Sequence, residues 1–106
     1  MESELFINSK DVQTAGTKYF DNDILATFDD LVSILGHPTK TYNDVKKTQY
    51  EWDLVIRDCE VTFTVYDYQE DHEIKHNEPI TWHIGAFDGA DSLIAWSFVN
   101  DLLKKK

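Results

Sequence analysis

The sequence predicts an α+β fold, in which an antiparallel sheet of three to five strands is packed by a short helix in the N-terminal half and by a C-terminal helix. Three observations predict it. A short amphipathic run stops at a glycine and a proline, three later segments alternate apolar and polar residues, and the last run is apolar over most of a helical circumference. A chain of 106 residues can bury one hydrophobic core. We therefore expect a single domain, residues 1–106, with 1–23 as edge strands or an arm over the core and 104–106 as a basic tail.

The first helix is predicted over residues 27–35. Its apolar side chains recur at i, i+3, i+4 and i+7 and form one stripe, consisting of Phe28, Leu31, Val32 and Leu35. Thr27 can cap the N-terminus, where the acidic side chains of Asp29 and Asp30 favour the positive end of the helix. Gly36 supplies a C-terminal cap, and Pro38 prevents continuation.

Three strands are expected after a polar connection. Their apolar faces are Tyr50, Trp52, Leu54 and Ile56, then Val61, Phe63 and Val65, then Ile80, Trp82 and Ile84. The opposite faces carry Glu51, Asp53 and Arg57, then Thr62, Thr64, Tyr66 and Tyr68, then Thr81 and His83. Short connections make these strands an antiparallel meander with one packed face and one partly wet face.

Residues 91–103 are predicted to form the closing helix, capped by Asp91 or Ser92. Its apolar residues cover most of the circumference, and only Ser97, Asn100 and Asp101 form a polar edge. Such a helix is buried on more than one side. Either the N-terminal segment covers it, or a second copy of the chain does, which would make a homodimer or higher oligomer through residues 91–103.

Charge is the strongest signal in the composition. Twenty acidic residues against ten basic ones give a formal net charge of −10. A field of that sign repels nucleic acid and anionic membranes and speeds encounter with basic surfaces. The alternative is that an acidic surface only keeps the chain soluble. No apolar run is long enough to span a membrane, the first residues lack a secretion signal, and the single cysteine, Cys59, fits a reducing cytosol.

Residues 72–76 read His-Glu-Ile-Lys-His, a match to H-E-x-x-H. In zinc proteases this pattern lies on a helix, so that both histidines reach one Zn²⁺ and the glutamate activates the bound water. Here the segment from Gln69 to Glu78 has one apolar residue, lies between two strands and ends at Pro79. We therefore expect an exposed acidic connection and no metal site, with an adventitious or structural metal, or a zinc hydrolase, as alternatives.

Carboxylates crowd this connection and the neighbouring strand. Closely spaced carboxylates repel one another, and a basic partner relieves that cost. They can imitate nucleic-acid phosphates, and tyrosines beside them can anchor a partner. The candidate partner-binding residues are Glu51, Asp53, Tyr66, Asp67, Tyr68, Glu70, Asp71 and Glu73. The alternative is a solvated charge run with no partner.

Five short motifs over residues 24–89 resemble, in order and spacing, a family of small proteins encoded by tailed bacteriophages. They are Phe28-Asp29-Asp30-Leu31-Val32, Leu35-Gly36-His37-Pro38, Tyr50-Glu51-Trp52, Val65-Tyr66-Asp67-Tyr68 and Ile80-Thr81-Trp82-His83-Ile84-Gly85. Members often carry Asp-Gly-Thr at the hairpin tip, where this chain has Asp58-Cys59-Glu60, a departure that changes the turn type. The resemblance implies a viral origin and this α+β layout. It implies no activity and no catalytic residue.

Together these observations predict a non-enzymatic protein without a cofactor, acting in the host-cell cytoplasm. We expect it to inhibit a host protein with a basic surface, such as a nucleic-acid-handling defence protein, through phosphate-mimicking carboxylates. The alternative is an oligomer that sequesters a nucleotide second messenger of host immunity. That ligand would contact Lys46, Lys47, Arg57, Trp82 and His83, with stacking from Tyr66 or Tyr68.

Overall fold

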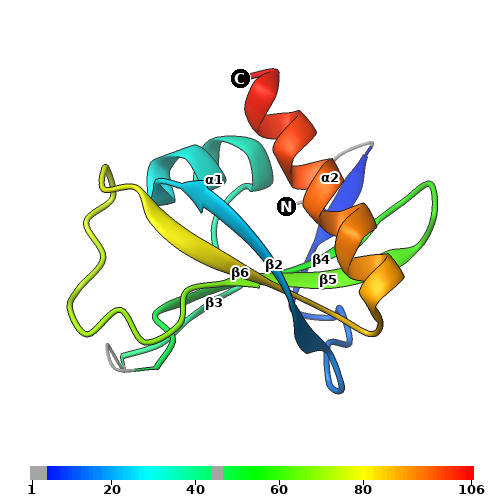
Figure 1. The fold of residues 1–106 in the computed structure, drawn as a ribbon, viewed down its shortest axis with the longest axis horizontal. Helices are drawn as coiled ribbons and strands as arrows, with labels where there is room; N and C mark the ends of the chain where they lie inside the picture. Colours follow the sequence, from blue (N-terminus) through cyan, green and yellow to red (C-terminus); the bar gives the residue numbers. More distant parts are fainter. Residues whose placement is uncertain (1–4, 44–46) are drawn as a thin grey trace.

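A computed structural model describes residues 5–43 and 47–106 and confirms the α+β fold. Within these ranges, six strands form one antiparallel sheet, and two helices pack against one of its faces (Figure 1). The elements are β1 (Phe6–Asn8), β2 (Lys18–Ala26), α1 (Phe28–Leu35), β3 (Lys40–Thr41), β4 (Tyr50–Ile56), β5 (Val61–Tyr66), β6 (Ile80–Ala86) and α2 (Gly89–Lys104). The sheet exceeds the expected five strands because two-residue β3 extends the edge of β4.

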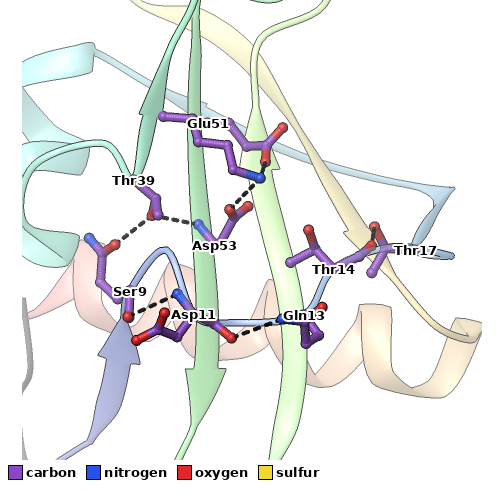
Figure 2. A network of polar contacts seen from close by, with 10 residues as sticks. Ser9, Asp11, Gln13, Thr14, Thr17, Thr39, Glu51 and Asp53 are labelled. Carbon is purple, nitrogen blue, oxygen red and sulfur yellow. Dashed lines mark hydrogen bonds and ion pairs between the residues drawn. The ribbon is translucent and has the colours of Figure 1, made fainter.

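The strand order is β1-β4-β5-β6-β2, with β3 also pairing with β4. The meander β4-β5-β6 occupies the centre, as predicted from the alternation. Both strands of the first 26 residues lie at its borders, where Phe6 faces Ile56 on one side and Ile24 faces Trp82 on the other. The connection 9–17 joins these two borders. It therefore crosses the sheet on the face that carries no helix, which we call the open face (Figure 2).

The core lies between the sheet and the two helices. Trp52 and Trp82 meet edge to face, with ring centroids 5.4 Å apart, and both are fully buried. Each indole finds a backbone acceptor, since Trp52 donates to the Gly36 carbonyl and Trp82 to the Ala26 carbonyl, both at 2.9 Å. Buried indole N–H groups need such partners, so the two tryptophans fix the ends of α1 relative to the sheet.

Helix α1 begins as predicted. Thr27 accepts a hydrogen bond from the Asp30 amide at 2.9 Å, and the Asp30 carboxylate accepts one from the Thr27 amide, which completes a capping box. Gly36 has φ 89°, a left-handed conformation that glycine adopts without steric cost. Lys106, in the predicted basic tail, forms an ion pair with Asp30 at 2.8 Å.

Helix α2 differs from its prediction at the N-terminus and on its surface. It begins at Gly89 because Asp88, and not Asp91 or Ser92, caps it by accepting from the Asp91 amide at 2.8 Å. One face, with Ala95 and Val99 at its centre, is buried against the sheet. Residues 5–23 leave part of the remaining surface uncovered, because three large apolar side chains stay exposed within the described structure: Leu93, Ile94 and Trp96. None of the helices in the described ranges has the length and apolar character needed to cross a bilayer.

Candidate functional site

The open face carries a hollow of about 410 Å³. The connection 9–17 contributes Thr14 and Thr17 to its lining, and β3 and its neighbours in the chain contribute Lys40, Tyr42 and Thr48. Tyrosine rings and threonine hydroxyls supply most of the lining, with one carboxylate and two ammonium groups: Thr14, Thr17, Lys18, Lys40, Tyr42, Thr48, Glu51, Thr64, Tyr66, Tyr68 and Gly85. The hollow is therefore polar, wide at its mouth and aromatic on several sides.

Glu51 and Asp53 form an acid pair on this face (Figure 2). They lie two residues apart on β4, so their side chains leave the sheet on the same side. The Lys40 ammonium lies 3.5 Å from Glu51 Oε2 and 3.1 Å from Asp53 Oδ2, and it therefore shares one positive charge between two carboxyl groups. The side chain of Asp53 is completely buried, and that of Glu51 is 19% exposed.

The position of Lys40 follows from polar contacts among β1, β3 and β4. Asn8 donates to the carbonyl oxygens of Leu35 and His37 at 3.0 and 2.8 Å. It also accepts from Thr39, whose hydroxyl in turn accepts from the Asp53 amide at 2.8 Å (Figure 2). This chain of hydrogen bonds holds the residue before β3 against β4, which places Lys40 over the acid pair.

Burial and the neighbouring Asp53 raise the pKa of Glu51 to about 7, although Lys40 opposes the shift. The close contact with Asp53 in turn raises the pKa of Lys40, which therefore stays charged. Among the described residues, neither oxygen of Asp53 accepts a hydrogen bond of good geometry, and the Lys40 ion pair is the one contact made by Oδ2. Asp53 is thus a buried acceptor that still lacks a donor.

A ring cluster adjoins the hollow. His83 stacks on Tyr19 with centroids 4.1 Å apart, and its centroid lies 5.5 Å from those of Tyr66 and Tyr68. The Tyr19 hydroxyl donates to Asp23 at 2.7 Å, and this bond raises the pKa of Tyr19 to about 12. The cluster agrees with the expectation that His83 lies beside Tyr66 and Tyr68 on the wet side of the sheet.

The acidic connection, residues 67–79, is irregular but firmly attached. The Gln49 side chain donates to the His72 carbonyl at 2.7 Å and accepts from the Ile74 amide at 2.9 Å. Ile74 is buried, and the backbone of residue 76 accepts from the Asp29 amide at 3.0 Å. The ring of His76 also stacks on Phe28, with centroids 4.2 Å apart. These contacts fix the course of the segment without regular secondary structure.

Two of the predicted phosphate-mimicking carboxylates are internal, which corrects their assignment. Asp67 is fully buried and accepts from the backbone amides of Gln49 and Tyr50 at 2.8 to 2.9 Å. Asp53 is also fully buried, with Lys40 against its Oδ2. A partner cannot touch either one. Glu51, Tyr66 and Tyr68 line the hollow, Glu70 is half-buried, and Asp71 and Glu73 are exposed.

The residues predicted to hold a nucleotide do not form one site. Trp82 is in the core, on the face opposite His83, and cannot stack on a ligand. Arg57 follows the end of β4, whereas Tyr66, the neighbour of His83, pairs with Glu51 at the start of that strand. Lys47 is exposed, and Lys46 lies outside the described residues.

The H-E-x-x-H segment is not helical. His72 Nε2 lies 3.0 Å from Glu78 Oε1, a bond that raises the pKa of His72, while His76 stacks on Phe28. The two imidazoles are thus engaged with different partners. The described part of the chain contains no group of three or more metal-ligating side chains.

The sequence alone did not predict Lys40 or Gln49 as site residues. Lys40 contacts the acid pair Glu51 and Asp53, and Gln49 holds the acidic connection in place. Both lie at the ends of the polar connection between α1 and β4, where periodicity carries no information. The alternation did place Glu51 and Asp53 on one face. The lysine beside them comes from β3, and only the pairing of β3 with β4 brings it there.

In comparisons with family models, curated proteins and solved structures, nothing matches this chain.

Proposed function

We propose that this chain is a non-enzymatic binding protein that engages a basic surface of a host protein and thereby inhibits it. The observation that carries the proposal is the state of Glu70, Asp71 and Glu73. Within the described residues, their carboxylates form no ion pair and no side-chain hydrogen bond, although the segment that holds them is fixed. The protein therefore displays unpaired negative charge at defined positions.

Fixed position matters because it lowers the entropic cost of binding. A mobile acidic segment would lose conformational freedom when a partner ordered it, whereas these carboxylates are already held. Asp71 even has a left-handed backbone, with φ 67°, as does Gln69, with φ 53°. Such conformations persist where surrounding contacts determine them, here the backbone bond from Gln69 to Lys47 and the Gln49 bridge.

The net charge of −10 attracts partners that present a basic surface. A basic surface is attracted over roughly a Debye length, about 8 Å at physiological salt, and the attraction weakens as salt rises. Tyr68, which is 49% exposed beside the acidic connection, offers an aromatic contact for arginine or lysine. A nucleic-acid-handling protein presents such a basic surface, and the carboxylates would occupy the place of phosphates.

A charge-matched pair of variants tests the proposal. The variant Glu70→Gln/Asp71→Asn/Glu73→Gln removes three charges from the acidic connection. The variant Asp58→Asn/Glu60→Gln/Asp101→Asn removes three exposed charges from the β4–β5 turn and from α2. Calorimetry with an arginine octapeptide at 50 mM salt should show about tenfold weaker binding for the first variant only, since exposed pairs contribute roughly 0.5 kcal/mol each. Equal losses in both variants would mean that net charge, and not this surface, attracts the peptide.

The ring cluster supports one second candidate, the sequestration of a nucleotide. His83, Tyr66 and Tyr68 offer faces for stacking, and Lys40 lies across the hollow. Against it, the Lys40 charge is already held by two carboxyl groups. A rise in melting temperature with cyclic nucleotides, lost in Tyr68→Ala, would favour this candidate over the first.

A further inference from the structure

Two carboxyl groups and one ammonium group lie close together at the hollow, whereas the exposed carboxylates of the acidic connection have no such cation beside them within the described residues. Glu51, Asp53 and Lys40 place two carboxyl groups and one ammonium group in a site where Asp53 is completely buried. With both acids ionised, the group carries one uncompensated negative charge in a poorly hydrated place, which is unfavourable. With Glu51 protonated, the same group is neutral.

A proton on Glu51 would supply a hydrogen-bond donor for the carboxylate oxygens of Asp53, which lack one within the described structure. Among the described residues, no group donates a well-formed hydrogen bond to Asp53, yet a buried carboxylate normally accepts several. A protonated Glu51 is a donor on the same side of the same strand. The raised pKa of Glu51, about 7, agrees with a proton that is present in roughly half of the molecules near neutral pH.

The hollow above the pair suits a cationic side chain. Glu51 reaches its wall, and the rings of Tyr42, Tyr66 and Tyr68 surround it. Aromatic faces and a carboxylate together bind guanidinium and ammonium groups. We propose that the hollow receives one cationic side chain of the basic partner, and that the proton on Glu51 leaves for solvent as this side chain binds the Glu51 carboxylate.

This inference rests on the proposed function, and its charge balance is closed. Before binding, the ammonium of Lys40 offsets Asp53, and Glu51 is neutral. After binding, Glu51 is ionised and the incoming cation offsets it. The group of Lys40, Glu51 and Asp53 is thus neutral before binding, and together with the incoming cation it is neutral after binding. Lys18, at the exposed side of the hollow, keeps its charge throughout. Docking therefore costs the removal of one proton.

Other titratable groups face the same place and have to be separated from Glu51. Tyr42 follows β3, Tyr66 lies opposite Glu51 in the β4–β5 register, and Lys18 of β2 lines the far side. Beyond Tyr66 lies His83, whose imidazole is a further group that can bind a proton. Loss of a histidine proton also favours a cationic ligand, so pH dependence alone does not identify Glu51.

The experiment combines a titration with calorimetry. Carbon-detected NMR of the free protein should give a midpoint near 7 for the Glu51 carboxyl group, and a midpoint closer to 4.5 in Asp53→Asn. Calorimetry with the arginine octapeptide, in buffers of different ionisation enthalpy, should show about 0.9 protons released per complex at pH 6 and about 0.1 at pH 8. The affinity should be about tenfold higher at pH 8 than at pH 6.

Glu51→Gln keeps the shape of the side chain and cannot release a proton, and Glu60→Gln removes an exposed charge at the β4–β5 turn as the control. We expect the first variant to lose most of the pH dependence and the control to retain it. If Glu51→Gln binds with the pH dependence of the unmodified protein, or if Glu51 titrates near 4.5, this inference is wrong while the proposed function stands. If the octapeptide fails to bind the unmodified protein at low salt, the proposed function falls, and this inference falls with it.

Discussion

Replacement of Asp67 by alanine should destabilise the protein by about 3 kcal/mol. Its buried carboxylate accepts from two backbone amides, those of Gln49 and Tyr50, and it joins the end of β5 to the start of β4. Each buried amide left without an acceptor costs about 2 kcal/mol. Burial raises the pKa of Asp67, so part of this cost, about 1 kcal/mol, is recovered when the charged group is removed. Asp67→Asn keeps one acceptor oxygen and should lose about 1 kcal/mol.

Urea unfolding of the three proteins measures these differences. With a slope of about 1.5 kcal/mol per molar urea, the midpoint should fall by about 2 M for Asp67→Ala and by less than half of that for Asp67→Asn. Hydrogen exchange should show faster exchange at the amides of Gln49 and Tyr50. A midpoint shift below about 0.5 M for the alanine variant, or unchanged exchange at both amides, would refute the view that Asp67 is a structural acceptor.

Three further changes test other parts of the structure. Between pH 4.5 and 7, Glu51 keeps a proton in the folded state that the unfolded chain has lost, so the free energy of unfolding falls as pH rises through this window. In urea unfolding, Glu51→Gln should therefore match the unmodified protein near pH 4 and be about 2 kcal/mol more stable at pH 8. In Gly85→Ala, the new methyl group would lie 2.6 Å from the hydroxyl oxygen of Thr64, so thermal unfolding should show a loss of about 1–2 kcal/mol that Thr64→Ala restores in the double variant. Gln49→Ala leaves the buried Ile74 amide without its acceptor and should cost about 2 kcal/mol, with faster exchange at that amide; unchanged exchange would show that the bridge does not hold the connection.

Alternation was sufficient to predict the centre of the sheet, because side chains two residues apart share a face. It also indicates that two of the candidate contact residues point into the core. Asp67 continues the alternate positions Val61, Phe63 and Val65, so the alternation alone predicts that its side chain points inward. Trp82 likewise lies between Ile80 and Ile84 on the packed face. The signal that these two side chains are not surface contacts was present in the sequence.

The burial of Asp53 could not be predicted in the same way. The alternation along β4 places Asp53 correctly on the open face, where an exposed side chain is expected. It is buried where Thr39 and Lys40 lie against it, and these residues reach β4 only through the pairing of β3 with β4. Strand order is a tertiary property that depends on pairings far apart in the chain. The site at Lys40, Glu51 and Asp53 therefore follows from topology, and periodicity could supply only two of its three members.

The acids of this chain divide into two kinds, and the division bears on function. A net charge of −10 already destabilises a compact state by self-repulsion, so each buried carboxylate needs local compensation. Asp67 obtains it from backbone amides, and Asp53 obtains it from Lys40. The carboxylates of Glu70, Asp71 and Glu73 receive none within the described residues, although the backbone of the acidic connection is fixed at Gln49. Compensation from outside the chain would therefore lower the free energy most at that connection, and a basic partner supplies it there without any rearrangement of the fold.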